Sequence, residues 1–170
     1  MKSKILILLI MLVSSLIFSQ EHEIKEKIEK QVNTQLWKPF KKSFENRDAI
    51  KYNDLHTDDV IRVNKWGIKV GEDFKKSNLV RYNKKDNIVR TIDLWFEHRL
   101  YNDNCGYEVG YYRIKSKSEE GNIKEHYARF HVVLKKVNGK WKIAQDWDTT
   151  NINDVPITNK DFQKGTPLAL

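Results

Sequence analysis

The segment His126–Thr149, HYARFHVVLKKVNGKWKIAQDWDT, decides the fold because it contains the strongest local structural signal in the chain. Two stretches of alternating apolar and polar residues flank Asn138-Gly139, a dipeptide that tolerates the positive φ angles of a two-residue type I′ turn. The segment is therefore predicted to form a β-hairpin. With a two-residue loop, Val137 lies opposite Lys140, and each further pair follows by counting back from the turn.

This register distributes the side chains of the hairpin over two faces. One face collects mostly apolar pairs: Phe130 with Trp147, Val132 with Gln145, Leu134 with Ile143, and Lys136 with Trp141. The other face collects Arg129 with Asp148, His131 with Asp146, Val133 with Ala144, and Lys135 with Lys142. The first face is predicted to join the core, and the second places two acid–base pairs side by side. A one-residue bulge would break this set.

The N-terminus has the pattern of a secretory signal peptide. Two lysines precede an apolar run, Ile5–Phe18, and a charged stretch follows Ser19-Gln20. The run is shorter than the roughly 20 apolar residues that a membrane-spanning helix needs. We therefore expect cleavage near Ser19 or Gln20, export to the periplasm or the medium, and no stable membrane anchor.

The composition fits one domain, residues 21–150, with a sizeable core. Removal of residues 1–20 takes away two lysines and no acids, which lowers the net charge from +8 to +6. Because the cations are interspersed with acids, they indicate a solvated surface, and no nucleic-acid partner is expected. Cys105 is the only cysteine, so no internal disulfide can form, and we expect it to be a small buried residue.

The first half of the chain is predicted to be mainly helical. Apolar residues recur every four positions along one long helix that Pro39 kinks or interrupts, namely Ile24, Ile28, Val32, Leu36, Phe40 and Phe44. Asp48 is expected to cap a short second helix that ends near His56. A third helix is predicted over residues 72–82, with Phe74, Leu79 and Val80 facing inward.

The second half of the chain is predicted to be mainly strands. One strand, residues 60–64, precedes the third helix, and strands over residues 88–101 and 107–117 lead into the hairpin. Residues 151–170 have weak periodicity and read as a loosely packed or frayed tail. The order of elements predicts an α+β fold with helices on one face of a curved antiparallel sheet.

Residues 24–150 resemble the nuclear transport factor 2-like superfamily, in its SnoaL-like branch of small bacterial proteins. The resemblance rests on the order of the elements and on two stretches, FENRDAIKYNDLHTDDVIRVN before a helix and NGKWKIAQDWDT at the end of the core. It implies a cone-shaped fold in which a strongly curved sheet wraps around the N-terminal helix. It also implies a pocket at the wide end and frequent dimerisation through the sheet.

The catalytic residues that this resemblance implies are replaced here. In ketosteroid isomerase relatives a general-base aspartate follows the DD strand, at the position of Asn64, and a tyrosine of the first helix corresponds to Phe40. An amide does not take up a proton as a carboxylate does, and phenylalanine has no hydroxyl. Epoxide hydrolase relatives need an arginine and an aspartate two residues apart on a middle strand, which here reads Glu97-His98-Arg99. The resemblance therefore favours binding without catalysis.

The best candidate site is the cluster of Arg129, His131, Asp146 and Asp148. If the cluster faces the pocket, the carboxylate beside His131 raises the pKa of the imidazole and fixes its tautomer, as an acid or base requires. The alternative places the cluster at a dimer surface or in water, because the other hairpin face is more apolar.

Aromatic residues supply further candidates for ligand contacts, although ordinary core and sheet packing explains them equally well. They are Tyr52, His56, Trp95 and Tyr112. The five histidines are scattered, and neither a metal-ligand spacing nor a phosphate-binding glycine loop occurs, so neither a metal nor a cofactor is expected.

Three functional hypotheses follow. The first is an exported, non-catalytic domain that binds a small, mostly apolar molecule, as a homodimer. The second is a lyase or isomerase in which His131 and Asp146 are the acid and base and Arg129 holds an anionic group. The third is a dimeric assembly module whose sheet surface is the functional part. The three hypotheses differ in which face of the hairpin lines the pocket.

Overall fold

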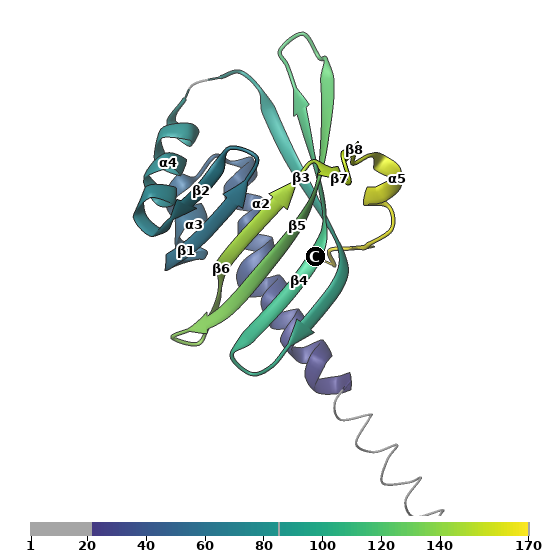
Figure 1. Ribbon diagram of the computed structural model, residues 1–170. Coiled ribbons are helices and arrows are strands. Elements are labelled where there is room, and N and C mark those ends of the chain that lie inside the picture. The colour runs from purple at the N-terminus through teal and green to yellow at the C-terminus, as the bar shows by residue number, and fades with distance from the viewer. Residues whose placement is uncertain (1–21, 85, 170) are drawn as a thin grey trace, which may run out of the picture.

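The computed structural model describes residues 22–84 and 86–169, and the predicted signal peptide, residues 1–20, lies outside the described residues. The N-terminal helices pack on one face of a bent seven-stranded sheet, so the predicted α+β fold is confirmed (Figure 1). The helices are α2 (Lys38–Glu45), α3 (Ala49–Asp54), α4 (Gly71–Asn83) and α5 (Asn159–Phe162), with a π-helical turn, Asn33–Trp37, before α2. In the described ranges no helix is long and apolar enough to cross a membrane.

The sheet has the strand order β2-β1-β6-β5-β4-β3-β9, and a separate two-stranded sheet joins β7 and β8. Neighbouring strands of the large sheet are antiparallel, except that β1 and β6 run parallel. The strands are β1 (His56–Asn64), β2 (Gly67–Val70), β3 (Val89–Tyr101), β4 (Cys105–Lys117), β5 (Ile123–Val137), β6 (Lys140–Thr149), β7 (Asn151–Ile152), β8 (Val155–Pro156) and β9 (Thr166–Pro167).

The long N-terminal helix passes through the concave side of the sheet without a break. Residues 22–32 are α-helical and lead through the π-helical turn into α2, with Pro39 in the first turn of α2. The wider turn accommodates the proline, which has no N–H to donate and crowds the preceding turn. Because the turn holds an extra residue, both Leu36 and Trp37 are buried. Most of the predicted apolar stripe is buried, but Ile24 is exposed.

The predicted hairpin forms, but its register changes partway along the strands. Positive φ angles at Asn138-Gly139 make the turn, and pairs from there to Leu134 with Ile143 follow the prediction. Ala144 is then an extra residue in β6, because Val133 pairs with Gln145. Such a bulge moves every later side chain of the strand to the opposite face.

The predicted pairs of His131 with Asp146 and of Arg129 with Asp148 are therefore wrong. Asp146 lies opposite Val132, and Asp148 lies opposite Phe130. Both carboxylates consequently share the concave, core-facing side of the sheet, where Arg62 of β1 lies between them. The regular register would leave this inward-facing arginine without its two carboxylates, so the buried ion pairs of Arg62 favour the bulge.

Two expectations about buried residues are also wrong. In α4 the inward stripe is Phe74, Asn78 and Tyr82, whereas Leu79 and Val80 are exposed. The burial of Asn78 is compensated because its amide donates to the side chain of Asn53 at 2.8 Å, across to α3. Cys105 is exposed rather than buried.

The C-terminal segment is packed rather than frayed. After β7 and β8, Thr158 and Asp161 form a capping box that begins α5. Phe162 of α5 is 1% exposed and lies against Trp95, with 4.7 Å between the ring centroids. The segment ends in β9, which pairs with β3. Figure 1 shows α5 beside β3 and β4, where it covers one end of the outer sheet face.

Candidate functional site

A pocket lies between the helices and the concave face of the sheet. Its cavity has a volume of about 90 Å³, several times the roughly 10–15 Å³ that one water molecule occupies on this measure. Its walls are mostly apolar and come from the long helix and strands β3 to β6: Trp37, Phe40, Phe44, Ile92, Leu94, Ile114, Phe130, Val132 and Ile143. Such walls fit a small apolar molecule.

One part of the pocket wall carries an ion-paired triad, Asp146–Arg62–Asp148. The Nη1 atom of Arg62 lies 2.7 Å from Oδ1 of Asp146, and its Nη2 atom donates to Oδ2 of Asp148. Tyr112 of β4 donates its hydroxyl hydrogen to the same Oδ2 atom at 2.9 Å. Each aspartate is only 8% exposed. The charges therefore pair with one another inside a largely apolar wall, although Nη1 of Arg62 has only its ion-pair contact with Asp146 and no hydrogen bond to a described residue.

The electrostatics of the triad follow from burial and pairing. Burial raises the pKa of Asp146, although the neighbouring Arg62 counteracts the shift. Burial alone would lower the pKa of Arg62, but Asp146 and Asp148 raise it above its ordinary value, so the guanidinium stays charged. Burial and Asp148 raise the pKa of Tyr112, which therefore stays a hydrogen-bond donor at neutral pH.

Tyr52 lines the pocket, and His56 lies behind it. Burial lowers the pKa of His56 to about 3, so its imidazole is neutral. The Nδ1–H group donates to the carbonyl oxygen of Tyr52 at 2.8 Å, and Nε2 has no hydrogen-bond partner among the described residues. The ring packs against Phe74 and Tyr52, each with 5.0 Å between centroids. His56 therefore supports the pocket wall from behind.

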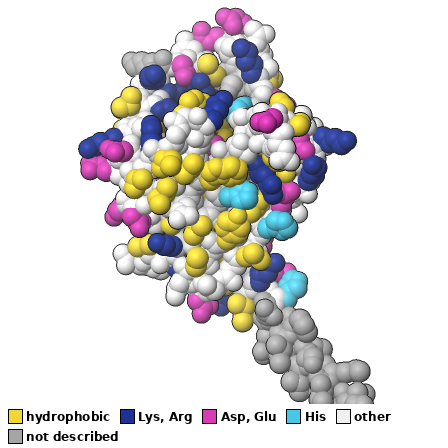
Figure 2. Space-filling view, viewed as in Figure 1, with side chains coloured by type: hydrophobic (Ala, Val, Ile, Leu, Met, Phe, Trp, Pro, Cys, Tyr) yellow, Lys and Arg dark blue, Asp and Glu magenta, His cyan; other side chains and the backbone are white. Residues whose placement is uncertain are grey.

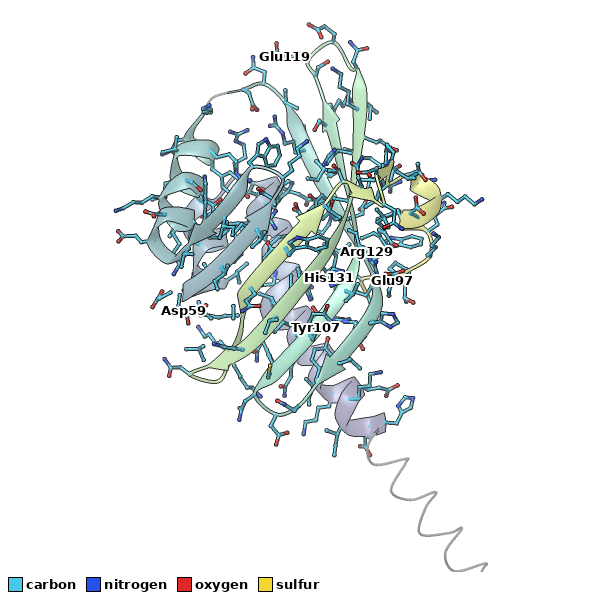
Figure 3. All side chains as sticks on the ribbon, viewed as in Figure 1. Asp59, Glu97, Tyr107, Glu119, Arg129 and His131 are labelled. Carbon is cyan, nitrogen blue, oxygen red and sulfur yellow. The ribbon has the colours of Figure 1, made fainter. Side chains whose placement is uncertain are left out.

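Two members of the predicted cluster, Arg129 and His131, lie on the outer face of the sheet. Their contact partners Glu97 and Tyr107 lie on the same face (Figure 3). Nδ1 of His131 lies 2.6 Å from the hydroxyl of Tyr107, and Arg129 pairs with Glu97 at 2.8 Å. Burial and Arg129 lower the pKa of His131. Trp95 is also on this face, beneath α5. Arg129, His131 and Trp95 are therefore separated from the pocket by the sheet.

The two positions at which catalytic residues are replaced differ in their surroundings. Phe40 lines the pocket, so the missing hydroxyl leaves that wall apolar. The side-chain oxygen of Asn64 accepts from the backbone N–H of Trp66 at 3.0 Å and thereby closes the turn between β1 and β2. Among the described residues, no group of three or more His, Cys, Asp or Glu side chains is arranged to hold a metal ion.

Two pocket residues, Arg62 and Arg81, were missed by the sequence analysis. Arg62 could have been found, because it lies two positions after Val60 and strand alternation puts both on the inner face. An inward-facing arginine needs buried carboxylates, which points to Asp146 and Asp148. Arg81 has no comparable signal, since the apolar pattern of its helix is weak and does not indicate which face is buried.

Of the comparisons with known proteins, only the comparison of structures finds similar proteins. No family model matches the sequence, and no curated protein matches it. A putative dehydratase of the nuclear transport factor 2-like family from Streptomyces avermitilis superimposes with a TM-score of 0.61 at 13% identity, covering 78% of this chain and 98% of the other.

Two further solved structures are similar to this chain to a comparable degree. A putative aromatic ring hydroxylase from Novosphingobium aromaticivorans has a TM-score of 0.59 at 14% identity, covering 72% of this chain and 89% of the other. A nuclear transport factor 2-like protein of unknown function from Shewanella oneidensis has a TM-score of 0.57 at 13% identity, covering 68% and 94%. At these identities the likeness establishes the fold alone. The chain therefore has the nuclear transport factor 2-like fold that its sequence indicated.

Proposed function

We propose that this protein binds a small, mostly apolar molecule in the pocket and does not catalyse its conversion. The observation that carries the proposal is the wall itself, in which apolar side chains surround a polar triad whose charges are already paired. An apolar ligand therefore leaves no buried charge without its partner. Each methylene that enters the pocket contributes about 0.8 kcal/mol, part of which offsets the cost of ordering the ligand.

Native mass spectrometry of residues 21–170, purified from cells of the source organism, tests this proposal. The expected result is a bound mass of one small molecule that organic solvent extracts. Ile114→Trp should exclude the molecule, because Ile114 lines the pocket and is only half-buried, which leaves room for the larger ring to settle. Ile123→Trp is the matched control, since Ile123 is 62% exposed on the next strand. Equal ligand mass in both variants would refute the proposal.

Acid–base catalysis by Asp146 is a second candidate function. The predicted partner His131 lies across the sheet, so this candidate rests on Asp146 alone. The observation in its favour is that burial raises the pKa of this carboxyl in an otherwise apolar wall. Incubation of the extracted ligand with the protein distinguishes the candidates. A product of different mass or different chromatographic retention that Asp146→Asn fails to produce would establish catalysis, and a ligand unchanged in both supports binding alone.

We further infer that the protein is a homodimer that associates through the outer sheet face. Figure 2 shows apolar side chains gathered across the middle of this face. They include Ile61, Ile68, Val70, Tyr107 and Trp147, which are between 36% and 69% exposed. An exposed apolar patch of this kind is typical of an interface.

Sedimentation equilibrium measures the association directly. Trp147→Glu should weaken the dimer, because it places a charge in the middle of the apolar patch. Leu79→Glu is a control of equal exposure, 39%, on α4 and away from this face. A wild-type protein that stays monomeric at high concentration would refute the dimer.

We also infer that residues 1–20 direct export and are removed, as the charge and hydrophobicity pattern of the N-terminus indicates. The intact mass of the protein recovered from the periplasm or the medium tests this inference. The expected N-terminus lies next to Ser19 or Gln20. Recovery of the full-length chain from the cytoplasm alone would contradict it.

A further inference from the structure

A second hollow adjoins the pocket and forms its mouth. It has a volume of about 300 Å³ and shares three wall residues with the pocket, Phe44, Arg81 and Ile114. Its remaining walls come from the turn after α2, the end of α4 and the start of β3. A molecule too long for the pocket can therefore extend into this hollow.

The mouth carries an excess of positive charge. Four cationic residues line it, and Asp86 is its only acid among the described residues; the cations are Arg47, Arg81, Lys84 and Arg90. Both Arg47 and Arg90 pair with Asp86 at 2.8 Å, so this carboxylate is already shared. Low-dielectric walls around such a charge excess concentrate the field on an incoming anion.

Arg81 is the cation of the mouth that also lines the pocket. Its guanidinium lies over the ring of Tyr82, 4.7 Å from the centroid, and donates to the side-chain oxygen of Asn78 at 3.1 Å. No carboxylate lies within ion-pairing distance of Arg81 in the part of the chain that the structure describes. Its charge is therefore not neutralised by a direct ion pair, although Arg81 also acts through space to lower the pKa of Asp146.

The hydroxyl of Tyr82 provides a second, independent observation. Tyr82 is 9% exposed and lines the mouth, yet its hydroxyl has no hydrogen-bond partner among the described residues. Buried hydroxyl groups are nearly always hydrogen-bonded, so this one lacks an acceptor. Burial raises the pKa of Tyr82, which keeps the hydroxyl protonated and able to donate at neutral pH.

The charge distribution fixes which way a ligand lies. Inside the pocket two carboxylates surround one guanidinium, so the triad Asp146–Arg62–Asp148 repels an anion when both acids are ionised. At the mouth Arg81 attracts one, and the buried hydroxyl of Tyr82 in the same wall lacks an acceptor. A ligand with an acidic group therefore places that group at the mouth and its apolar body inside.

We propose that the ligand is an amphipathic carboxylate whose head group binds Arg81 and Tyr82 at the mouth while its apolar body occupies the pocket. This inference rests on the proposed binding function and narrows it to one class of molecule. The carboxylate oxygens accept from the guanidinium and from the phenolic hydroxyl, which supplies the acceptor that Tyr82 lacks.

Calorimetric titration of residues 21–170 with three probes of equal chain length tests the proposal: octanoate, 1-octanol and octylamine. Octanoate is expected to bind about tenfold more tightly than 1-octanol, with an advantage that decreases as salt is added. Arg81→Gln should reduce octanoate affinity to that of 1-octanol and leave 1-octanol unchanged. Tyr82→Phe should weaken octanoate by about threefold to tenfold.

Lys76→Gln is the matched control, because it removes the same charge from an exposed position of α4 that pairs with Glu72. This variant should retain the preference for octanoate. Equal binding of octanoate and 1-octanol, or tighter binding of octylamine, would overturn the proposal and leave the binding function intact. If none of the three probes binds, the binding function itself fails.

Discussion

Replacement of Arg62 by methionine tests the buried triad, because it removes the shared cation and leaves two carboxylates in an apolar wall. The side chains of Arg62, Asp146 and Asp148 are 17%, 11% and 10% exposed, so water screens them little. Loss of one partner from a buried ion pair typically costs about 3–5 kcal/mol. We expect Arg62→Met to lower the free energy of unfolding at pH 7 by an amount in this range.

The loss of stability caused by Arg62→Met should become smaller as the pH falls. Burial already raises the pKa of Asp146 above the value of about 3.9 for an unfolded aspartate, and without Arg62 this pKa rises further. The folded variant then binds protons more tightly than the unfolded chain, so its deficit shrinks as the pH falls from 7 towards 4. The recovery from this carboxyl has an upper limit of about 1.4 kcal/mol per pH unit.

Urea unfolding monitored by tryptophan fluorescence, at pH 7 and pH 5, provides the assay. The triple variant Arg62→Met, Asp146→Asn, Asp148→Asn should recover most of the stability, because it removes the buried charges together. Lys142→Met is the control, since its partner Asp54 is exposed and the pair contributes about 1 kcal/mol or less. A cost below 1 kcal/mol for Arg62→Met, or one that is equal at both pH values, would refute a buried triad.

Three further predictions concern residues outside the triad. His56 is neutral and has a folded-state pKa of about 3, so the free energy of unfolding falls as the pH drops below about 6.5, the pKa of an unfolded histidine. In urea unfolding at pH 7 and pH 5, His56→Asn should remove about 2 kcal/mol of this loss. Phe162→Ala should cost about 3–5 kcal/mol in chemical unfolding, whereas Val155→Ala, at an exposed site, should change stability by less than about 0.5 kcal/mol. Gly110→Ala should lower stability by about 1–3 kcal/mol in the same assay, because an added Cβ would lie 2.2 Å from the carbonyl oxygen of Trp95.

The parts of the fold that were predictable from sequence are those set by local chemistry. Asn138-Gly139 specifies its turn, and Asp48 caps α3 by accepting from the backbone N–H of Lys51. The long helix is visible because its apolar residues recur at helical spacing. Each of these signals lies within a few residues of the structure that it specifies.

The parts that were not predictable depend on contacts between distant segments. The bulge at Ala144 is favoured by Arg62, which is far away in sequence, and one inserted residue moved Asp146 to the face opposite His131. The ordered C-terminal segment likewise depends on Phe162 reaching the outer sheet face at Trp95. Periodicity within a strand or a tail contains no information about such partners.

Methyl-resolved NMR of residues 21–170 with bound 1-octanol tests the central claim, that the pocket holds an apolar ligand, most directly. The predicted result is intermolecular nuclear Overhauser contacts from the ligand chain to methyl groups of Ile92, Leu94 and Ile143, which line the pocket. Contacts confined to methyl groups of the outer sheet face, such as those of Ile61 and Leu100, or no contacts at saturating ligand, would contradict it.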